Sequence, residues 1–357
     1  MRGVGERAPV WFHGASVGDM RALAPLVAAV AAARPTMPAH VSATTRDGRR
    51  LARRLFPAAT HSRPPLGPWP GRALDRIGPR LIVLEYLELW PAWIAAAARR
   101  RIPVAVVDGR VTHRSLRIRP LLARAAGRLA LFCARTEADA AAARALGVAP
   151  DRIRVTGNGK YDGVPLAPPA PDEALCAAIG AREVVVGSLH PDEERPALEA
   201  LADSGLRAVV APRYPRRADA ILRFARRRGI TAARRTASSP AAQWVVLDTI
   251  GELAAAYAIA PVAIVGGTFG RRDGQNLVEP AAHGRPVIHG PRIANVAVEA
   301  AALAGRGGWP APDWPAACAL ARARLADPGP DPRPALVGLT GATARNLDAL
   351  LPFLDSL

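Results

Sequence analysis

The sequence feature that most constrains the fold is the stretch at residues 262–280, VAIVGGTFGRRDGQNLVEP. A short β-branched apolar run that breaks into glycines is typical of a buried parallel strand ending in a ligand-binding loop. Glycines there let backbone N–H groups approach a phosphate closely, and the N-terminus of the following helix favours an anion. A capped, glycine-rich connector is the other interpretation. A second strand-loop-helix pattern follows at residues 283–291, HGRPVIHGP, and favours the ligand site.

Two polar residues close this stretch at a helical spacing. Asn276 and Glu279 are three residues apart, so at the start of a helix they share one face. A carboxylate can accept hydrogen bonds from two ribose hydroxyls, and an amide can both donate and accept. We therefore predict that Asn276 and Glu279 hold the ribose of a nucleotide.

The pattern of the whole chain indicates two α/β domains. A length of 357 residues is comfortable for two such domains, and half of the residues are hydrophobic. Predicted strands alternate with helical stretches rich in Ala, Arg and Leu, which favours parallel sheets built from βαβ units. The Pro-rich stretch at 164–171 is the best linker candidate. We expect an N-terminal domain at 1–163, a C-terminal domain at 172–338, and a helix within 339–357 that packs back on the first domain.

The formal charge of +18 calls for an anionic partner. An anionic membrane face and a multiply phosphorylated substrate both fit such a charge. Aromatic residues make up only 5% of the chain and are not interleaved with the basic ones, so nucleic acid binding is poorly supported. We expect an anionic inner-membrane surface and a phosphorylated substrate as partners, and no nucleic acid.

Cysteine usage and hydropathy indicate the cellular compartment of the protein. Cys133, Cys176 and Cys318 are scattered without a CxxC pair, which favours a reducing compartment and argues against a zinc site. Apolar runs stay well short of the roughly 20 residues that a membrane span needs, and we recognise no signal peptide. We expect a cytoplasmic protein, peripheral on the inner face of the inner membrane, without a bound metal.

Residue types that are rare in this chain indicate another set of candidate site residues. Lys160 is the only lysine among the 48 Lys and Arg residues, and asparagine occurs only at Asn158, Asn276, Asn295 and Asn346. A chain that uses arginine wherever charge alone matters keeps lysine where an ammonium is not interchangeable with a guanidinium. We therefore place Asn158 and Lys160 among the residues that line the site.

Polar residues also follow several predicted strands at their carboxyl ends, the edge at which open α/β sheets bind ligands. Asp19 lies near a helix N-terminus after the strand at 10–13, where it is either the N-cap of the helix or a general base. Glu88 lies in the loop after a later strand. Arg213 follows the strand at 208–210 and can clamp a phosphate through two parallel hydrogen bonds.

Seven motifs occur in order along the chain: ASVGD, ELWP, GNGKYD, GSLHPDEE, PRYP, DTIGEL and DGQNLVEPAAHGRPV. Together they resemble the 3-deoxy-D-manno-octulosonic acid (Kdo) transferases, glycosyltransferases of the GT-B fold, over residues 13–295. The resemblance implies two Rossmann-like domains facing an interdomain cleft, with CMP-Kdo held mainly by the second and a lipid A precursor offered to the first. It also implies an inverting, metal-independent transfer of Kdo in lipopolysaccharide core biosynthesis, with CMP-Kdo as the donor substrate and no cofactor.

The mechanism that fits both the residues and the resemblance needs few groups. Asp19 takes the proton of the attacking hydroxyl, and Arg213 with the Ser188 loop stabilises the departing phosphate. The turn at Gly251 contacts the cytosine through backbone groups. The expected catalytic residues are Asp19 and Glu88; the expected donor-binding residues are Ser188, His190, Arg213, Gly251, Glu252, Gly274, Asn276 and Glu279; the expected acceptor or cleft residues are Ser16, Gly18, Arg110, Asn158 and Lys160.

The chain departs from the resembled pattern at several positions. The base of the family is the glutamate of SVGE, and here that position is Asp19. The family's ETELWP keeps its second acid as Glu88, while Tyr86 replaces the first. GHN and PRHP become GQN and PRYP, through Gln275 and Tyr214. The membrane anchor that usually precedes the first domain is not recognised.

Two alternatives from other classes stay open. One is a GT-B enzyme with a different donor or acceptor, such as a UDP-sugar epimerase or hydrolase. The other is a non-catalytic protein that binds a membrane or a nucleic acid.

Overall fold

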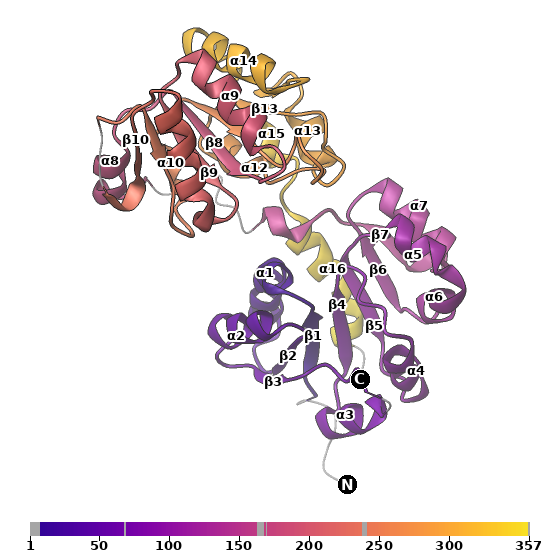
Figure 1. Ribbon diagram of the computed structural model, residues 1–357. Coiled ribbons are helices and arrows are strands. Elements are labelled where there is room, and N and C mark those ends of the chain that lie inside the picture. The colour runs from indigo at the N-terminus through magenta and orange to yellow at the C-terminus, as the bar shows by residue number, and fades with distance from the viewer. Residues whose placement is uncertain (1–7, 68, 163–167, 169, 238–240, 356–357) are drawn as a thin grey trace. The chain divides into compact units, whose positions relative to one another are not determined.

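The computed structural model describes residues 8–355 except 68, 163–167, 169 and 238–240. The chain divides into two compact units. The first comprises Met1–Gly163 together with Thr340–Leu357, and the second comprises Val164–Leu339 (Figure 1). The predicted linker at 164–171 begins where the second unit begins, and most of it lies outside the described residues.

The first unit is built on a seven-stranded sheet in the order β3-β2-β1-β4-β5-β6-β7. All of its neighbouring strands pair in parallel. The order reverses between β1 and β4, and such a switch point is where doubly wound sheets bind ligands at their carboxyl edge. The strands are β1 Val10–Gly14, β2 Ala39–Ala43, β3 Thr60–Ser62, β4 Leu81–Glu85, β5 Val104–Gly109, β6 Leu131–Ala134 and β7 Ile153–Val155.

Helices cover both faces of this sheet, because side chains of its central strands alternate between two hydrophobic clusters. In β1, Val10 and Phe12 belong to the cluster that includes helix α1, and Trp11 belongs to the cluster that includes helix α4. The helices are α1 Val17–Ala33, α2 Arg46–Leu55, α3 Pro70–Ile77, α4 Pro91–Arg99, α5 His113–Arg117, α6 Arg119–Ala126, α7 Glu137–Leu146 and α16 Ala342–Asp355, with 3₁₀ turns η1 Pro150–Arg152 and η2 Gly159–Tyr161.

The C-terminal helix α16 belongs to the first unit and packs against α1 (Figure 1). Leu350 and Leu354 are buried in the same cluster as residues of α1 and β1. At the end of the helix, both carboxylate oxygens of Asp355 accept hydrogen bonds from the Arg34 guanidinium, at 2.5 and 2.7 Å from Nη2. This exposed ion pair contributes little to stability, because water screens it. The buried apolar side chains therefore contribute most of the free energy that holds α16 against the sheet.

The second unit repeats the design with the order β10-β11-β9-β8-β12-β13-β14, again parallel throughout. The run predicted as a strand at 262–265 is β12, which is fully buried between β8 and β13. The strands are β8 Val184–Leu189, β9 Ala208–Pro212, β10 Ala232–Arg234, β11 Trp244–Val246, β12 Val262–Val265, β13 Val287–His289 and β14 Gly308–Pro310. The helices are α8 Glu173–Ile179, α9 Glu194–Ser204, α10 Ala218–Arg227, α11 Leu253–Ala256, α12 Val278–Ala282, α13 Ala297–Leu303, α14 Trp314–Ala326 and α15 Arg333–Val337, with 3₁₀ turns η3 Pro215–Arg217 and η4 Arg235–Ala237.

The expected α/β fold class with two Rossmann-like domains is confirmed. Both sheets are parallel, and each is wound with helical connections, as the alternating pattern of the sequence predicts. Among the described residues, every helix is too short or too polar to cross a bilayer.

A carboxylate ties the beginning of α16 to the rest of the first unit. Asp162 accepts hydrogen bonds from the backbone N–H groups of Gly341, at 2.6 Å, and Thr343, at 2.5 Å. We expect Asp162→Ala to lower the free energy of unfolding of this unit by about 1–2 kcal/mol, because both donors lose a charged acceptor. Hydrogen exchange should accelerate at the amides of α16. Asp151→Ala, which removes an exposed carboxylate from η1, is the control; equal destabilisation by both variants would contradict the prediction.

Candidate functional site

Asp19 lies at the first turn of α1, directly after β1. Ser16 is the N-cap of this helix, and Asp19 is the third helical residue. One oxygen of Asp19, Oδ2, accepts hydrogen bonds from the N–H groups of Ala15 and Ser16, both at 2.8 Å, while the Ser16 hydroxyl accepts from the Asp19 N–H. This reciprocal arrangement is a capping box. The interpretation of Asp19 as the N-cap is therefore wrong, and the Ser-x-x-Asp spacing was the signal for the true arrangement.

The capping box uses only one carboxylate oxygen of Asp19. The side chain is half-buried, and none of the described residues donates a hydrogen bond to its other oxygen, Oδ1. Gly14 shows how closely β1 and α1 approach, because a Cβ there would lie 2.7 Å from the Cβ of Asp19. Asp19 is thus oriented by two backbone N–H groups through one oxygen, and the second oxygen could accept a proton.

Glu88 lies beside the carboxyl end of β1. Its Oε2 accepts a hydrogen bond from the Trp90 indole at 2.9 Å and lies 3.9 Å from Nε2 of the buried His13. His13, and after it Trp90, lower the pKa of the Glu88 carboxyl below its ordinary value, although burial opposes them. The His13 ring is itself held by Ser42, whose Oγ lies 2.9 Å from Nδ1. Sequence reasoning missed His13 as a partner of Glu88, because the contact joins β1 to the loop after β4, far apart in sequence.

A buried pair of carboxyl groups lies at the ends of β4 and β5. Oδ1 of Asp108 accepts hydrogen bonds from the N–H of Gly159 at 2.9 Å and from Nδ2 of Asn346 in α16 at 3.1 Å. Both carboxyl oxygens of Glu85 are buried without a hydrogen-bond partner among the described residues. Burial, and next the charge of Asp108, raise the pKa of Glu85 well above its ordinary value.

The expected cleft residues of the first unit lie around this carboxyl edge, but in different roles. The Asn158 side chain accepts from the N–H of Lys160 at 3.2 Å and so caps η2, which packs against α1. The Lys160 ammonium lies 4.9 Å from the centre of the Tyr161 ring. Gly18 is exposed in the first turn of α1, and Arg110 follows β5 in a half-buried position. The structure therefore places Asn158 and Lys160 in a turn that packs against α1, the helix that begins beside Ser16 and Asp19.

In the second unit, the carboxyl ends of β8, β9 and β11 enclose a cavity of about 270 Å³. Three of the predicted donor residues line it: Ser188, Arg213 and Gly251. Tyr214 and Ile250 line it as well, and Ile250 is 90% exposed. Ser188 has a φ of 54°, at a point where the register between β8 and β9 shifts. None of the described carboxylates forms an ion pair with the exposed Arg213 guanidinium, so Arg213 is suited to an anionic ligand.

The glycine-rich loop after β12 binds a carboxylate of the chain itself. The buried side chain of Glu193 accepts from the N–H groups of His190 at 3.0 Å, Gly267, Phe269 at 3.3 Å and Gly270 at 3.1 Å. Burial raises the pKa of Glu193, and these N–H groups oppose that rise. The N–H groups of Gly267, Phe269 and Gly270 are therefore already occupied by Glu193, and the expectation that other N–H groups of the loop bind a phosphate stays a prediction.

His190 extends the same network. Its Nε2 lies 3.1 Å from the side-chain nitrogen of Gln275, whereas Nδ1 is buried without a hydrogen-bond partner among the described residues. The ring stands nearly perpendicular to the Tyr214 ring, with centroids 6.2 Å apart, so His190 lies behind a wall residue of the cavity. Burial, and next the charge of Arg272, lower the pKa of His190, which keeps it neutral at pH 7.

The remaining predicted donor residues do not line the 270 Å³ cavity. Asn276 precedes α12, donates to Glu279 Oε1 at 3.0 Å and accepts from the N–H of Val278 at 2.9 Å. Glu252 forms an ion pair with Arg235 at 2.9 Å. Gly274 has a φ of 123°, and a Cβ there would meet Val296 at 2.6 Å. The pair Asn276–Glu279 thus keeps only part of its hydrogen-bonding capacity for a ribose.

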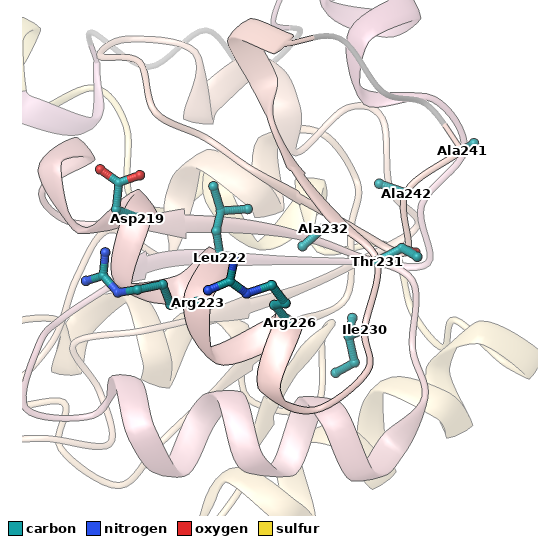
Figure 2. A pocket seen from close by; sticks show the side chains of 9 residues that line it. All are labelled: Asp219, Leu222, Arg223, Arg226, Ile230, Thr231, Ala232, Ala241 and Ala242. Atoms are coloured by element: carbon teal, nitrogen blue, oxygen red, sulfur yellow. The ribbon is translucent and has the colours of Figure 1, made fainter.

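A larger cavity of about 610 Å³ lies between α10 and β10 (Figure 2). Arg223 and Arg226 of α10 border it together with apolar residues such as Leu222 and Ile230. It contains none of the predicted site residues. No group of three or more His, Cys, Asp or Glu side chains is placed to hold a metal ion in the described part of the chain. Metal independence stays a prediction.

Solved structures similar to this chain define its class by fold. A glycosyltransferase from Rickettsia africae ESF-5 has a TM-score of 0.70, is 10% identical, and is matched over 98% of this chain and 100% of its own. A UDP-GlcNAc 2-epimerase from Neisseria meningitidis has a TM-score of 0.63 and 12% identity, over 97% and 100% of the two chains. With its two parallel Rossmann-like sheets, the protein has the GT-B fold.

Sequence comparison identifies the family. Residues 2–163 match the family described as 3-deoxy-D-manno-octulosonic-acid transferase (kdotransferase). The 3-deoxy-D-manno-octulosonic acid transferase of Bordetella pertussis is 35% identical over 96% of this chain and 87% of its own length. The enzyme of the same name from Chlamydophila psittaci is 30% identical, over 79% and 69% of the two chains. The chain belongs to the Kdo transferase family.

The buried carboxyl of Glu85, whose pKa is raised by burial and next by the charge of Asp108, makes stability depend on pH. The native pKa of Glu85 lies above the unfolded one, so between those values the native state binds more protons. Stability from this group is present below the unfolded pKa and is lost as pH rises through the native pKa, at up to about 1.4 kcal/mol per pH unit. Glu85→Gln, which keeps a neutral donor, should remove that slope in urea unfolding measured from pH 5 to 8.

The exposed acid Glu137 supplies the matched control. Glu137→Gln should leave the pH dependence of stability as it is in the parent protein. Parallel curves for the parent and Glu85→Gln would show that Glu85 is ionised in the native state.

Proposed function

We propose that the protein is a glycosyltransferase that moves Kdo, or a related sugar acid, from CMP-Kdo to a lipid A precursor in lipopolysaccharide core biosynthesis. The observation that carries this proposal is the 35% identity to the Bordetella pertussis enzyme over 96% of the chain. At 96% of the chain, this similarity spans both units.

The donor is held by the second unit. Arg213 binds the phosphate of CMP, because its exposed guanidinium lines the 270 Å³ cavity and forms no ion pair with a described carboxylate. Ser188 adds a hydroxyl, and the turn at Gly251 supplies backbone groups to the base. The glycine loop acts indirectly, since Glu193 holds it in place. Asn276 and Glu279 bind the ribose with the hydrogen-bonding capacity that their mutual contact leaves.

Transfer is a single inverting displacement. Oδ1 of Asp19 accepts the proton of an acceptor hydroxyl as that oxygen forms a bond to the anomeric carbon of the sugar acid. The bond from that carbon to the CMP phosphate oxygen breaks, and CMP leaves with the electron pair, stabilised by Arg213. Glu88 stays ionised, because the pKa of its carboxyl is lowered, and it helps to orient the acceptor.

The acceptor is lipid-linked, so we further propose that the protein works at the anionic inner face of the inner membrane. Its charge of +18 favours such a surface.

The UDP-sugar enzymes among the solved structures share only the fold. Thermal shift with CMP and with UDP tests the donor, and transfer of Kdo from CMP-Kdo to a lipid A precursor tests the reaction. Stabilisation by UDP alone, without transfer, would overturn the proposal.

Removing the basic oxygen of Asp19 should separate catalysis from helix capping. Asp19→Asn keeps an oxygen that accepts from Ala15 and Ser16, so stability should fall by at most about 1 kcal/mol. Turnover should fall by roughly 10²- to 10⁴-fold, because the base is lost, and CMP affinity should be unchanged. Asp47→Asn, which removes the acid in the first turn of α2, is the control. A purified Asp19→Asn protein with the parental rate would exclude Asp19 as the base.

Arg213 should account for a large part of CMP affinity. A charge-assisted hydrogen bond contributes about 1.5–3 kcal/mol, so Arg213→Ala should weaken CMP binding by roughly 10- to 150-fold in calorimetric titration. Arg306→Ala removes another exposed arginine of the second unit, from the loop before β14, and should leave binding unchanged. Equal CMP affinity in both variants, with the fold intact, would mean that the phosphate binds elsewhere.

A further inference from the structure

A group of exposed apolar side chains lies where two neighbouring helices of the first unit begin. Helices α4 and α6 pack against each other and lead away from the carboxyl ends of β4 and β5. Trp90 is the N-cap of α4 and is 37% exposed. Ile118, the N-cap of α6, is 41% exposed, and Leu121 in its first turn is 70% exposed. We call Trp90, Ile118 and Leu121 the α4–α6 rim.

The rim is surrounded by positive charge. Residues 110–128 contain six arginines and no acid: Arg110, Arg114, Arg117, Arg119, Arg124 and Arg128. In the part of the chain that the structure describes, Arg114, Arg117 and Arg119 are exposed and form no ion pair, unlike Arg100, which pairs with Asp75. Unpaired arginines around exposed aliphatic side chains are the composition of surfaces that lie in the interface of an anionic bilayer.

The rim is also connected to the candidate site. The Trp90 indole donates its N–H to Glu88, at 2.9 Å, while part of its ring is exposed. Arg110, an expected acceptor residue, precedes α5. An indole with one polar end held and an apolar body exposed is suited to the boundary between head groups and acyl chains. A surface that meets the membrane here would hold the carboxyl edge of the first sheet close to a lipid-linked acceptor.

We propose that the α4–α6 rim docks on the surface of an anionic lipid bilayer. This inference rests on the proposed function for its purpose, since a lipid-linked acceptor is what the docking serves. Ile118 and Leu121 enter the interfacial region, and the arginines around them contact anionic head groups. A nucleic acid is the less suitable partner, because residues 110–128 contain no aromatic side chain on which bases could stack.

The basic helix α2 provides the sharpest internal comparison. It carries Arg50 and Arg54 in exposed positions, and its one exposed large apolar side chain, Leu55, is 40% exposed, close to Ile118 but well below Leu121 at 70%. Binding that depended on charge alone would involve α2 as much as α5 and α6. Binding through the rim depends on both charge and the aliphatic side chains.

Co-sedimentation with vesicles of phosphatidylglycerol and phosphatidylethanolamine, free of any sugar acceptor, tests the proposal. Arg117→Gln/Arg119→Gln should weaken binding by roughly 30-fold, from about 1 kcal/mol per arginine near an anionic surface. Ile118→Ser/Leu121→Ser should weaken it by roughly 10-fold at unchanged charge. The controls Arg50→Gln/Arg54→Gln and Val337→Ser, the latter at a 62% exposed site of the second unit, should lose less than about 3-fold.

Several outcomes would overturn the proposal. Binding that is equal on neutral and anionic vesicles, or unchanged between 50 and 300 mM salt, contradicts it, because exposed charges are screened over roughly 8–10 Å. An equal loss in the α2 and rim variants shows general electrostatic attraction, and binding to duplex DNA but not to vesicles shows a nucleic acid surface. Vesicle binding requires no sugar transfer, so its failure and the failure of the transferase proposal can be told apart.

Discussion

The carboxylate of Glu193 determines how the central loop of the second unit is built. It accepts hydrogen bonds from backbone N–H groups of His190, Gly267, Phe269 and Gly270, so it takes the place that a phosphate takes in other glycine-rich loops. A buried loop needs partners for its N–H groups whether or not a substrate is bound. Glu193 supplies an acceptor for these N–H groups from within the protein.

The same principle organises the first unit. Asp19 satisfies the N–H groups before α1, Asp108 satisfies that of Gly159, and Asp162 satisfies those at the start of α16. In a chain with 48 Lys and Arg residues against 30 acids, carboxylates placed on backbone N–H groups are lost as partners for arginine. Arginines such as Arg213 and Arg119 consequently stay without an ion pair among the described residues, and they are the groups available to anionic ligands.

The sequence was enough to predict what depends on local pattern. β-Branched runs followed by glycines identified β12 and the parallel class of both sheets. The end of β9 indicated Arg213, which lines the 270 Å³ cavity, and its role toward a ligand stays a prediction. The contacts that could not be predicted join distant positions: Glu193 lies 74 residues from Gly267, and Asp108 lies 238 from Asn346. No periodicity encodes such pairs. For this reason the composition of the glycine loop could not reveal that Glu193 occupies the N–H groups of Gly267, Phe269 and Gly270.

The capping box places a condition on any catalytic role of Asp19. In the resembled pattern SVGE, the glutamate stands three residues after the serine, which is the spacing of a Ser-x-x-Glu capping box. Here the shorter aspartate still reaches both N–H groups, and it does so with Oδ2 alone. A Cβ at position 14 would lie 2.7 Å from the Cβ of Asp19 and 2.8 Å from Cε of Met20, so these side chains leave no room for another one there. For the proposed role of Asp19 as the base, proton transfer falls to the single oxygen Oδ1, because Oδ2 already accepts two hydrogen bonds.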